Sequence, residues 1–305
     1  MTERLHIEVS SDKTRVRLED FLFDRFPGLS RMYLRDVIKR KKCEINGRLE
    51  NKGKRVSGGD FIEIELDLNR ETAMRPQKMP LEIVYEDADL MVINKRAGML
   101  VHPTHRDKSG TLLNALTFYL QKRARQQGRN MQLPDNTLSD ARASAFVRPG
   151  LVHRLDKETS GLIVVAKSTR VHRILARQFQ RRAVEKKYLA LVDGVVKKDE
   201  GTIDGNIGRH AEEKRWDLKT DGKVSETRYR VRKRFIDTTL LELEPVTGRT
   251  NQLRIHCASI GHPIVGDTLR SGRKSKRLCL HAYKLGFRQP SHGEWLEFEA
   301  PISFR

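Results

Sequence analysis

The stretch from Gly150 to Lys167 constrains the fold of this chain more than any other part of the sequence. It contains a polar loop around Asp156, followed by the run Leu-Ile-Val-Val-Ala at residues 162–166. A short, continuously apolar run of this kind predicts a buried β-strand, and Gly161 before it permits a sharp turn. The sequence therefore places a carboxylate shortly before a strand of the core.

A helix is predicted directly after this strand. Ser168 or Thr169 can cap its first turn. Apolar side chains then recur at helical spacing, namely Val171, Ile174, Leu175 and Phe179. The polar side carries five arginines, at positions 170, 173, 177, 181 and 182. From the residues alone, Asp156 beside His153 and Arg154 is compatible with a carboxylate that caps a turn as well as with a catalytic one.

The charge of the chain indicates what it binds. The 305 residues carry a formal net charge of +20. This excess attracts polyanions, of which nucleic acids are the commonest, and it exceeds the charge of about 2 to 8 that solubility requires. We therefore expect a nucleic-acid partner.

Other classes of protein are disfavoured by what the sequence lacks. No stretch approaches the roughly 18 to 20 consecutive apolar residues that span a bilayer, and the first residues do not resemble a secretory signal peptide. Cys43, Cys257 and Cys279 are odd in number and form no C-x-x-C pair, which argues against a disulfide framework or a zinc site. We expect a cytoplasmic protein that does not bind membranes, with all three cysteines buried.

Residues 15–66 have the pattern of a small unit of their own. Helical spacing of apolar residues over 18–26 ends at Pro27-Gly28, and Ser30 can cap a second helix in which Leu34, Val37 and Ile38 face one way. A short strand and turn follow at 43–47. After a turn at 58–60, apolar and acidic residues alternate up to Leu66, as in a half-buried strand.

This unit resembles the S4 RNA-binding domain. The matching features are the R-L-E-D-F-L opening, the S-R-M-Y-L-R-D-V-I helix, the I-N-G turn and the G-G-D before the last strand. The resemblance implies a basic helical face that docks on RNA phosphates, formed by Arg31, Arg35, Lys39, Arg40 and Lys42. Such contacts supply affinity rather than sequence choice. The alternative is a helix pair whose cations are merely solvated.

A larger unit is predicted to follow. Residues 67–79 are polar and are interpreted as a linker, and the second unit spans residues 80–305. Within it, residues 89–94 predict a buried strand and residues 95–98 a turn. Residues 121–148 predict a loop with a short basic helix at its start.

Four motifs in this second unit resemble those of the RluA-type pseudouridine synthases. The first is H-R-L-D-x-x-T-S-G at 153–161, and the second is a strand with Tyr188 at 185–194. The third is T-G-R-T-N-Q-L-R at 247–254, continuing to Asp267, and the last is L-C-L-H at 278–281. They occur in the family's order. The third motif departs from the family at Asn251, where histidine is common.

The resemblance implies a fold and a set of catalytic residues. The fold is α+β: a mixed, largely antiparallel sheet with flanking helices and a central cleft, preceded by the small S4-like unit. Asp156 is implied to be the indispensable catalytic residue. Arg254, on a short helix that Thr250 can cap and Gly261 can end, is implied to pair with Asp156. Tyr188 is implied to stack on the target base, with a hydroxyl that can act as a base.

The resemblance also implies how RNA enters the site. A uridine inside a folded RNA must leave its stack to be reached. Arg154 would then fill the space left behind, with His153 beside it in contact with the RNA. Leu280 would help to wall the base pocket.

The expected function is that of an isomerase acting on uridines of RNA. Ribosomal RNA is the preferred substrate and transfer RNA the alternative. We expect no cofactor, because the reaction is an isomerisation with no redox change. We also expect a monomer that binds no metal. Two other functions stay open: a noncatalytic RNA-binding protein of the same fold, and a glycosidase with paired carboxylates. The latter needs a second acid in the pocket, for which Glu158 and Asp267 are the candidates.

Overall fold

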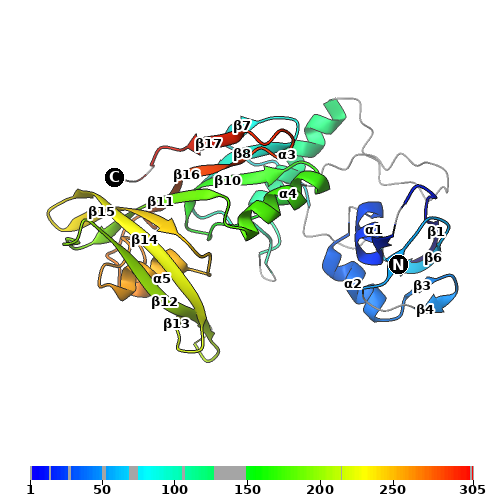
Figure 1. The fold of residues 1–305 in the computed structure, drawn as a ribbon, viewed down its shortest axis with the longest axis horizontal. Helices are drawn as coiled ribbons and strands as arrows, with labels where there is room; N and C mark the ends of the chain where they lie inside the picture. Colours follow the sequence, from blue (N-terminus) through cyan, green and yellow to red (C-terminus); the bar gives the residue numbers. More distant parts are fainter. Residues whose placement is uncertain are drawn as a thin grey trace. The chain divides into compact units, whose positions relative to one another are not determined.

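The computed structural model describes residues 2–13, 15–26, 29–49, 53–68, 75–104, 107–126, 149–213, 215–302 and 304. The chain divides into two compact units (Figure 1). The first comprises Met1–Lys78, Pro103–Ser109 and Asn114–Arg148, and the second comprises Met79–His102, Gly110–Leu113 and Pro149–Arg305. Of the loop predicted over 121–148, residues 127–148 lie outside the described ranges, and residues up to 126 belong to helix α3 (Leu112–Gln126). The predicted domain boundaries stay a prediction.

Most of helix α3 belongs to the first unit. Within residues 2–68, the described part of this unit forms two further helices and a four-stranded antiparallel sheet with the strand order β1-β6-β3-β4. The helices are α1 (Leu18–Arg25) and α2 (Arg31–Lys39). The strands of the sheet are β1 (Glu3–Glu8), β3 (Cys43–Ile45), β4 (Arg48–Leu49) and β6 (Phe61–Leu66). Strands β2 (Val16–Arg17) and β5 (Arg55–Val56) form a separate pair.

Local sequence explains most of this unit. The Ser30 hydroxyl accepts a hydrogen bond from the Tyr33 backbone N–H at 3.1 Å, so the predicted cap of α2 is confirmed. After its first residue, the apolar residues of β6 are buried and share one core with α1, α2 and Cys43, whereas Phe61 is exposed. Residues 27 and 28, predicted to end the first helix, lie outside the described ranges, and α1 itself ends at Arg25.

The second unit is built on an 11-stranded sheet. The strand order is β13-β12-β14-β15-β11-β16-β10-β8-β7, with β17 paired to β16 and β9 paired to β10. The strands are β7 (Ile83–Glu86), β8 (Leu90–Lys95), β9 (Gly150–Leu151), β10 (Ser160–Ala166), β11 (Glu185–Asp193), β12 (Glu200–His210), β13 (Arg215–Leu218), β14 (Lys223–Arg234), β15 (Thr238–Pro245), β16 (Leu280–Arg288) and β17 (Trp295–Glu299). Every pair is antiparallel except β10 with β16, so the predicted mixed, largely antiparallel sheet is confirmed.

The parallel pair of β10 and β16 joins the two halves of this sheet. Ser160 lies opposite His281, and Gly161 lies opposite Ala282. A Cβ at position 161 would lie 2.2 Å from the Ala282 carbonyl oxygen, and φ there is +117°. Only glycine fits such a close approach of two backbones. The predicted turn at Gly161 is therefore wrong, because this residue lies inside a strand.

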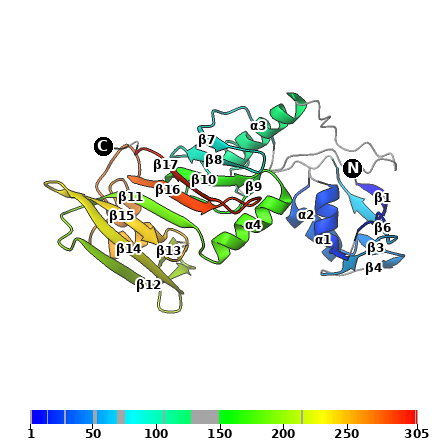
Figure 2. The ribbon, with the colours of Figure 1, turned by 45° about the horizontal axis from the view of Figure 1, so that its top comes forward.

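Two helices of the second unit pack on the sheet. Helix α4 (Thr169–Gln180) follows β10 and runs alongside it (Figure 2), with Val171 and Leu175 buried and Ser168 as the predicted cap. Helix α5 (Gln252–Ser259) packs against β12, β14 and β15, and a short 3-10 helix, η1, spans Thr268–Arg270. Among the described residues, no helix has the length and apolar character to cross a membrane.

Candidate active site

A pocket of about 630 Å³ lies in the second unit, and all four motifs contribute to it. Asp156, Tyr188, Arg254 and Leu280 line it, each from a different motif. The fold thus brings residues that are far apart in the sequence to one cavity of a size that suits a small molecule or a nucleotide.

Asp156 lies in the loop between β9 and β10 and is half-buried at the pocket. Its backbone carbonyl accepts a hydrogen bond from the Thr159 N–H at 3.2 Å, and the neighbouring Leu155 is buried. Within the described ranges, no donor or cation contacts the Asp156 carboxylate. The residue is therefore anchored by its backbone and its neighbour, while its carboxylate can meet a ligand.

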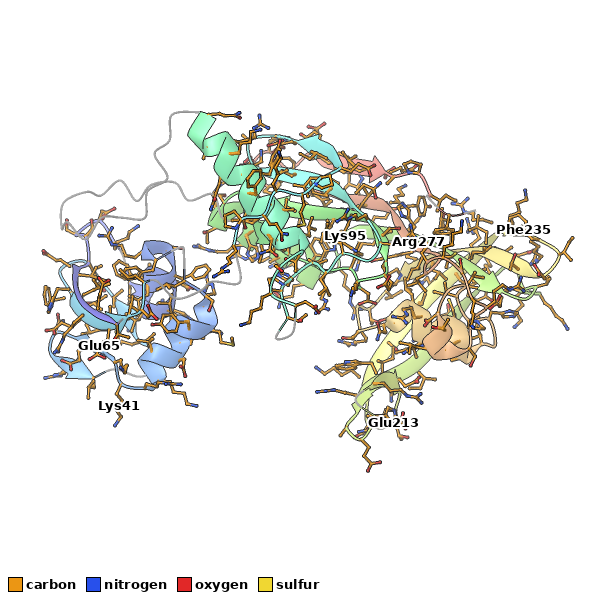
Figure 3. All side chains as sticks on the ribbon, turned by 180° about the vertical axis from the view of Figure 1, so that it is seen from behind. Lys41, Glu65, Lys95, Glu213, Phe235 and Arg277 are labelled. Atoms are coloured by element: carbon orange, nitrogen blue, oxygen red, sulfur yellow. The ribbon has the colours of Figure 1, made fainter. Side chains whose placement is uncertain are left out.

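Lys95 ties this loop to strand β8. It ends β8 rather than lying in the predicted turn (Figure 3), and its side chain is only 1% exposed. Its ammonium donates to three backbone carbonyls, those of Arg96 at 2.9 Å, Met99 at 2.8 Å and Lys157 at 3.1 Å. Burial lowers the pKa of Lys95 to about 8, although the carboxylates of Glu158 and Asp156 act in the opposite direction. Sequence reasoning missed this role because carbonyl acceptors leave no side-chain pattern.

Tyr188 and Leu280 lie on the neighbouring strands β11 and β16 and line the pocket. Burial raises the pKa of the Tyr188 phenol, and the charge of Asp156 raises it further. The phenol therefore keeps its proton at neutral pH. An aromatic ring with a polar tip suits stacking on a base, and the expected role of the hydroxyl as a base stays a prediction.

Arg254 pairs with Asp267 and not, as expected, with Asp156. Its Nε lies 2.7 Å from Asp267 Oδ2 and its Nη2 lies 2.6 Å from Oδ1, a bidentate arrangement. The Asp267 side chain is fully buried. Burial alone would lower the pKa of Arg254, but the Asp267 hydrogen bonds and nearby carboxylate charges, including that of Asp156, outweigh it and raise the pKa. Asp267, which the sequence suggested only as the possible second acid of a glycosidase, therefore orients the arginine. The charge of Arg254 acts on Asp156 from beyond contact distance.

Gln252 holds together the segment that forms one wall of the pocket. Its Oε1 accepts from the Thr247 hydroxyl at 2.7 Å and from the Arg249 N–H at 2.9 Å. Its Nε2 donates to the Glu226 carbonyl at 2.8 Å and to the Thr227 hydroxyl at 3.0 Å. Every polar group of this buried amide thus has a partner. Sequence reasoning missed this role, although Gln252 lies within the third motif.

Helix α5 begins differently from the prediction. The residue before its first turn is Asn251, with φ +57° and no side-chain cap, so the expected Thr250 cap is wrong. Asparagine tolerates this left-handed conformation better than most residues. Its Oδ1 lies 3.4 Å from Arg254 Nη1. Gly261, with φ +79°, follows the end of the helix as predicted.

His153 and Arg154 both line the pocket, in different environments. His153 Nε2 accepts the Val164 N–H at 3.0 Å, and its ring stacks on Phe179 with centroids 4.5 Å apart. Burial, and secondarily the charge of Lys186, lower the pKa of His153 to about 3, so the imidazole is neutral. Arg154 is exposed and, in the described part of the chain, has no carboxylate in contact. RNA contact by either residue stays a prediction.

The predicted RNA-binding cations of the first unit are mostly paired with carboxylates. The ion pairs are Arg31–Asp20 at 2.5 Å, Arg35–Glu19 at 2.7 Å, Arg40–Asp36 at 2.9 Å and Lys42–Glu65 at 2.7 Å. Lys39 is exposed at the end of α2. Contact of these residues with RNA also stays a prediction.

The acids named for a glycosidase do not face the pocket. Asp267 is buried against Arg254, and Glu158 is exposed outside the pocket lining. Glu185 and Glu244 do line it, and Glu185 lies within 3.4 Å of Lys187 and Lys284. Across the described ranges, no three His, Cys, Asp or Glu side chains gather as metal ligands do, and the three cysteines are buried and form no disulfide.

Known proteins resemble this chain along its full length. Residues 89–259 match the family described as RNA pseudouridylate synthase. The chain is 38% identical to an RNA pseudouridine synthase of Aquifex aeolicus (strain VF5), over 100% of this chain and 96% of that protein. It is 35% identical to the ribosomal large subunit pseudouridine synthase D of Escherichia coli O157:H7, over 99% and 92%. The solved structure of human RNA pseudouridylate synthase domain containing 1 has a TM-score of 0.54 and 29% identity, over 76% of this chain and 85% of that one.

Proposed function

Because the chain belongs to the RNA pseudouridylate synthase family, we propose that it isomerises uridines of ribosomal RNA to pseudouridine with Asp156 as the catalytic carboxylate. The match over residues 89–259 and the full-length relatives support the enzyme class. Relatives named for the ribosomal large subunit support the substrate. The observation that carries the proposal for the site is the Asp156 carboxylate, uncontacted by the described residues, in a pocket to which all four motifs contribute.

The reaction needs little from the protein beyond one carboxylate and a shaped cavity. The bond between N1 of the base and C1′ of the sugar breaks, the base turns, and C5 joins C1′. The C5 proton leaves and N1 gains one, so atoms and electrons balance without a cofactor. Asp156 can assist by attack on the sugar, attack on the base or removal of a proton.

Other pocket residues would orient the reacting groups. Arg254, held by Asp267, places a fixed positive charge near Asp156. The neutral ring of Tyr188 and the side chain of Leu280 offer apolar surface to the base. The guanidinium of Arg154 is planar and can stack in the gap that an everted uridine leaves. We expect the enzyme to act as a monomer in the cytoplasm.

The test is to map pseudouridines in total RNA from cells with and without this gene, restored with the wild-type protein or with Asp156→Asn. Loss of one or more ribosomal RNA sites, recovered by wild type only, is the expected result. Loss of sites in transfer RNA alone would show that transfer RNA, and not ribosomal RNA, is the substrate. Recovery by Asp156→Asn would refute the catalytic assignment.

A further inference from the structure

The exposed side of α4 carries a row of arginines. Arg173, Arg177 and Arg181 follow at intervals of four residues, so they share one side of the helix about 6 Å apart along its axis. All three are exposed. Among the described residues, none of them has a carboxylate within ion-pair distance, whereas Arg170 on the same helix lies 3.5 Å from Asp89. The row is therefore a set of unneutralised charges.

Arg182, directly after this row, has a backbone conformation that glycine usually occupies. Its φ is +58°. Its N–H donates to the Phe179 carbonyl, and the next N–H, of Ala183, donates to the Gln178 carbonyl. This is the helix ending in which the left-handed residue is most often glycine, and a side chain there costs about 1 kcal/mol. Arginine occupies the position all the same, and it lines the pocket.

Lys186 places a second cation at the same end of the pocket lining. It lies on β11 two residues before Tyr188 and is half-buried, with Nζ 6.0 Å from the centre of the Phe179 ring. Burial lowers the pKa of Lys186, and the charge of Arg182 lowers it further. No carboxylate of the described chain contacts either cation. Arg182 is exposed and Lys186 is half-buried. Their like charges repel each other, and a bound anion would relieve that repulsion.

We propose that Arg182 and Lys186 form a phosphate-binding subsite for the RNA strand that carries the target uridine, and that Arg181, Arg177 and Arg173 continue this surface along α4. The proposal rests on the proposed function, because it assigns a path to the same substrate. Phosphates repeat along a strand, and a row of cations one helical turn apart can follow them. A phosphate at the subsite would lie beside the cavity that receives the base, so it would fix the position of the strand without reading its sequence.

The test compares full-length variants in binding an RNA oligonucleotide that contains a target uridine. We expect Arg182→Gln with Lys186→Gln to raise Kd and KM about tenfold at low salt and to change kcat little. The slope of log Kd against log salt concentration should fall in magnitude by about 1 to 2. Lys186→Arg should retain most of the affinity. Arg170→Gln, a matched control on the same helix, should bind within about twofold of wild type, because this arginine is already paired.

Several results would overturn the proposal. One is a double variant with the wild-type Kd and salt slope, and another is an equal loss in Arg170→Gln. A double variant that loses thermal stability but keeps the wild-type affinity would show that these cations stabilise the end of the helix and do not bind RNA. Inorganic phosphate that competes as well as an oligonucleotide would indicate a site for free phosphate.

Two arrangements keep the test decisive. If the double variant does not fold, Arg173→Gln with Arg177→Gln replaces exposed residues only, and a wild-type salt slope there refutes the surface along α4. Binding is measured separately from pseudouridine formation. A wild-type protein that binds but does not isomerise therefore refutes the proposed function alone, and an active enzyme with an unaltered salt slope in the variants refutes the phosphate subsite alone.

Discussion

Helices α2 and α4 both carry arginines on an exposed face, and the two faces differ in what surrounds those charges. On and beside α2, Arg31, Arg35 and Arg40 each lie within 2.9 Å of a carboxylate oxygen. On α4, Arg173 and Arg177 contact no carboxylate of the described chain. A paired cation must share or release its partner to bind a phosphate, whereas a free one need not. The net charge of +20 therefore does not say which surface binds RNA most strongly.

Two largely buried cations near the pocket differ from both of these faces in what neutralises or solvates their charge. Arg254 is neutralised by a buried carboxylate, and Lys95 is satisfied by three carbonyls that carry no net charge. Both arrangements hold the surroundings of Asp156 in place. Arg254 and Lys95 therefore help to build the site, whereas the exposed arginines of α4 are available to a ligand.

The largest effect is expected at the buried pair. Asp267→Ala leaves Arg254 buried without its carboxylate, which should lower the free energy of unfolding by about 3 to 5 kcal/mol and abolish activity. Denaturant unfolding and single-turnover assays measure the two effects. Asp267→Asn keeps one acceptor and should lose less. An unchanged unfolding free energy in the alanine variant would show that the pair does not hold Arg254.

Lys95 should make the free energy of unfolding depend on pH, with an effect slightly smaller than that expected for Asp267→Ala. Its pKa in the folded protein is about 8, below its ordinary value of 10.5, so between these pH values the unfolded chain binds more protons. Stability from this group is therefore fully present above pH 10.5 and lost as the pH falls through 8. The stability of wild type relative to Lys95→Met should rise by up to about 3 kcal/mol across that window, measured by denaturant unfolding. A difference that does not vary with pH would contradict the burial of a titrating ammonium.

The two basic faces can be compared directly. Replacing Arg173, Arg177 and Arg181 by Gln should weaken RNA binding about tenfold or more at low salt, with a shallower salt dependence. The matched triple variant of Arg31, Arg35 and Arg40 should weaken it less, and each lost ion pair should cost about 0.2 to 1 kcal/mol of stability. Filter binding at several salt concentrations, with thermal unfolding, measures both. A larger loss of affinity in the α2 variant would reverse the comparison.

Elements decided by local interactions were predictable from the sequence. Ser30 and Ser168 cap their helices as predicted, β6 alternates between buried and half-buried residues after the exposed Phe61, and β10 is buried throughout. The resemblance of the four motifs also indicated which residues share one pocket. In the helix caps and strands, the residues that carry the signal lie within a few positions of the structure they form, whereas the pocket was indicated only by the resemblance of the motifs.

Features that depend on distant partners were not predictable. Gly161 lies against Ala282, which is 121 residues later in the sequence. Glycine is required there because the two backbones approach too closely for a side chain, not because the chain turns. Arg254 could pair with more than one carboxylate, and only the packing around α5 selects Asp267. Lys95 reaches the Lys157 carbonyl, 62 residues away, through a backbone group that every residue possesses. Each case needs the tertiary structure to identify the partner.

The most direct test concerns the Asp156 carboxylate, and the measurement is single-turnover pseudouridine formation in a ribosomal RNA fragment by Asp156→Asn. This change keeps the size of the side chain and removes its charge and basicity. The rate should fall by about 10⁴-fold, while the Kd for the RNA and the free energy of unfolding stay close to wild type. A variant that forms pseudouridine at the wild-type rate would contradict the assignment of the reaction to this residue.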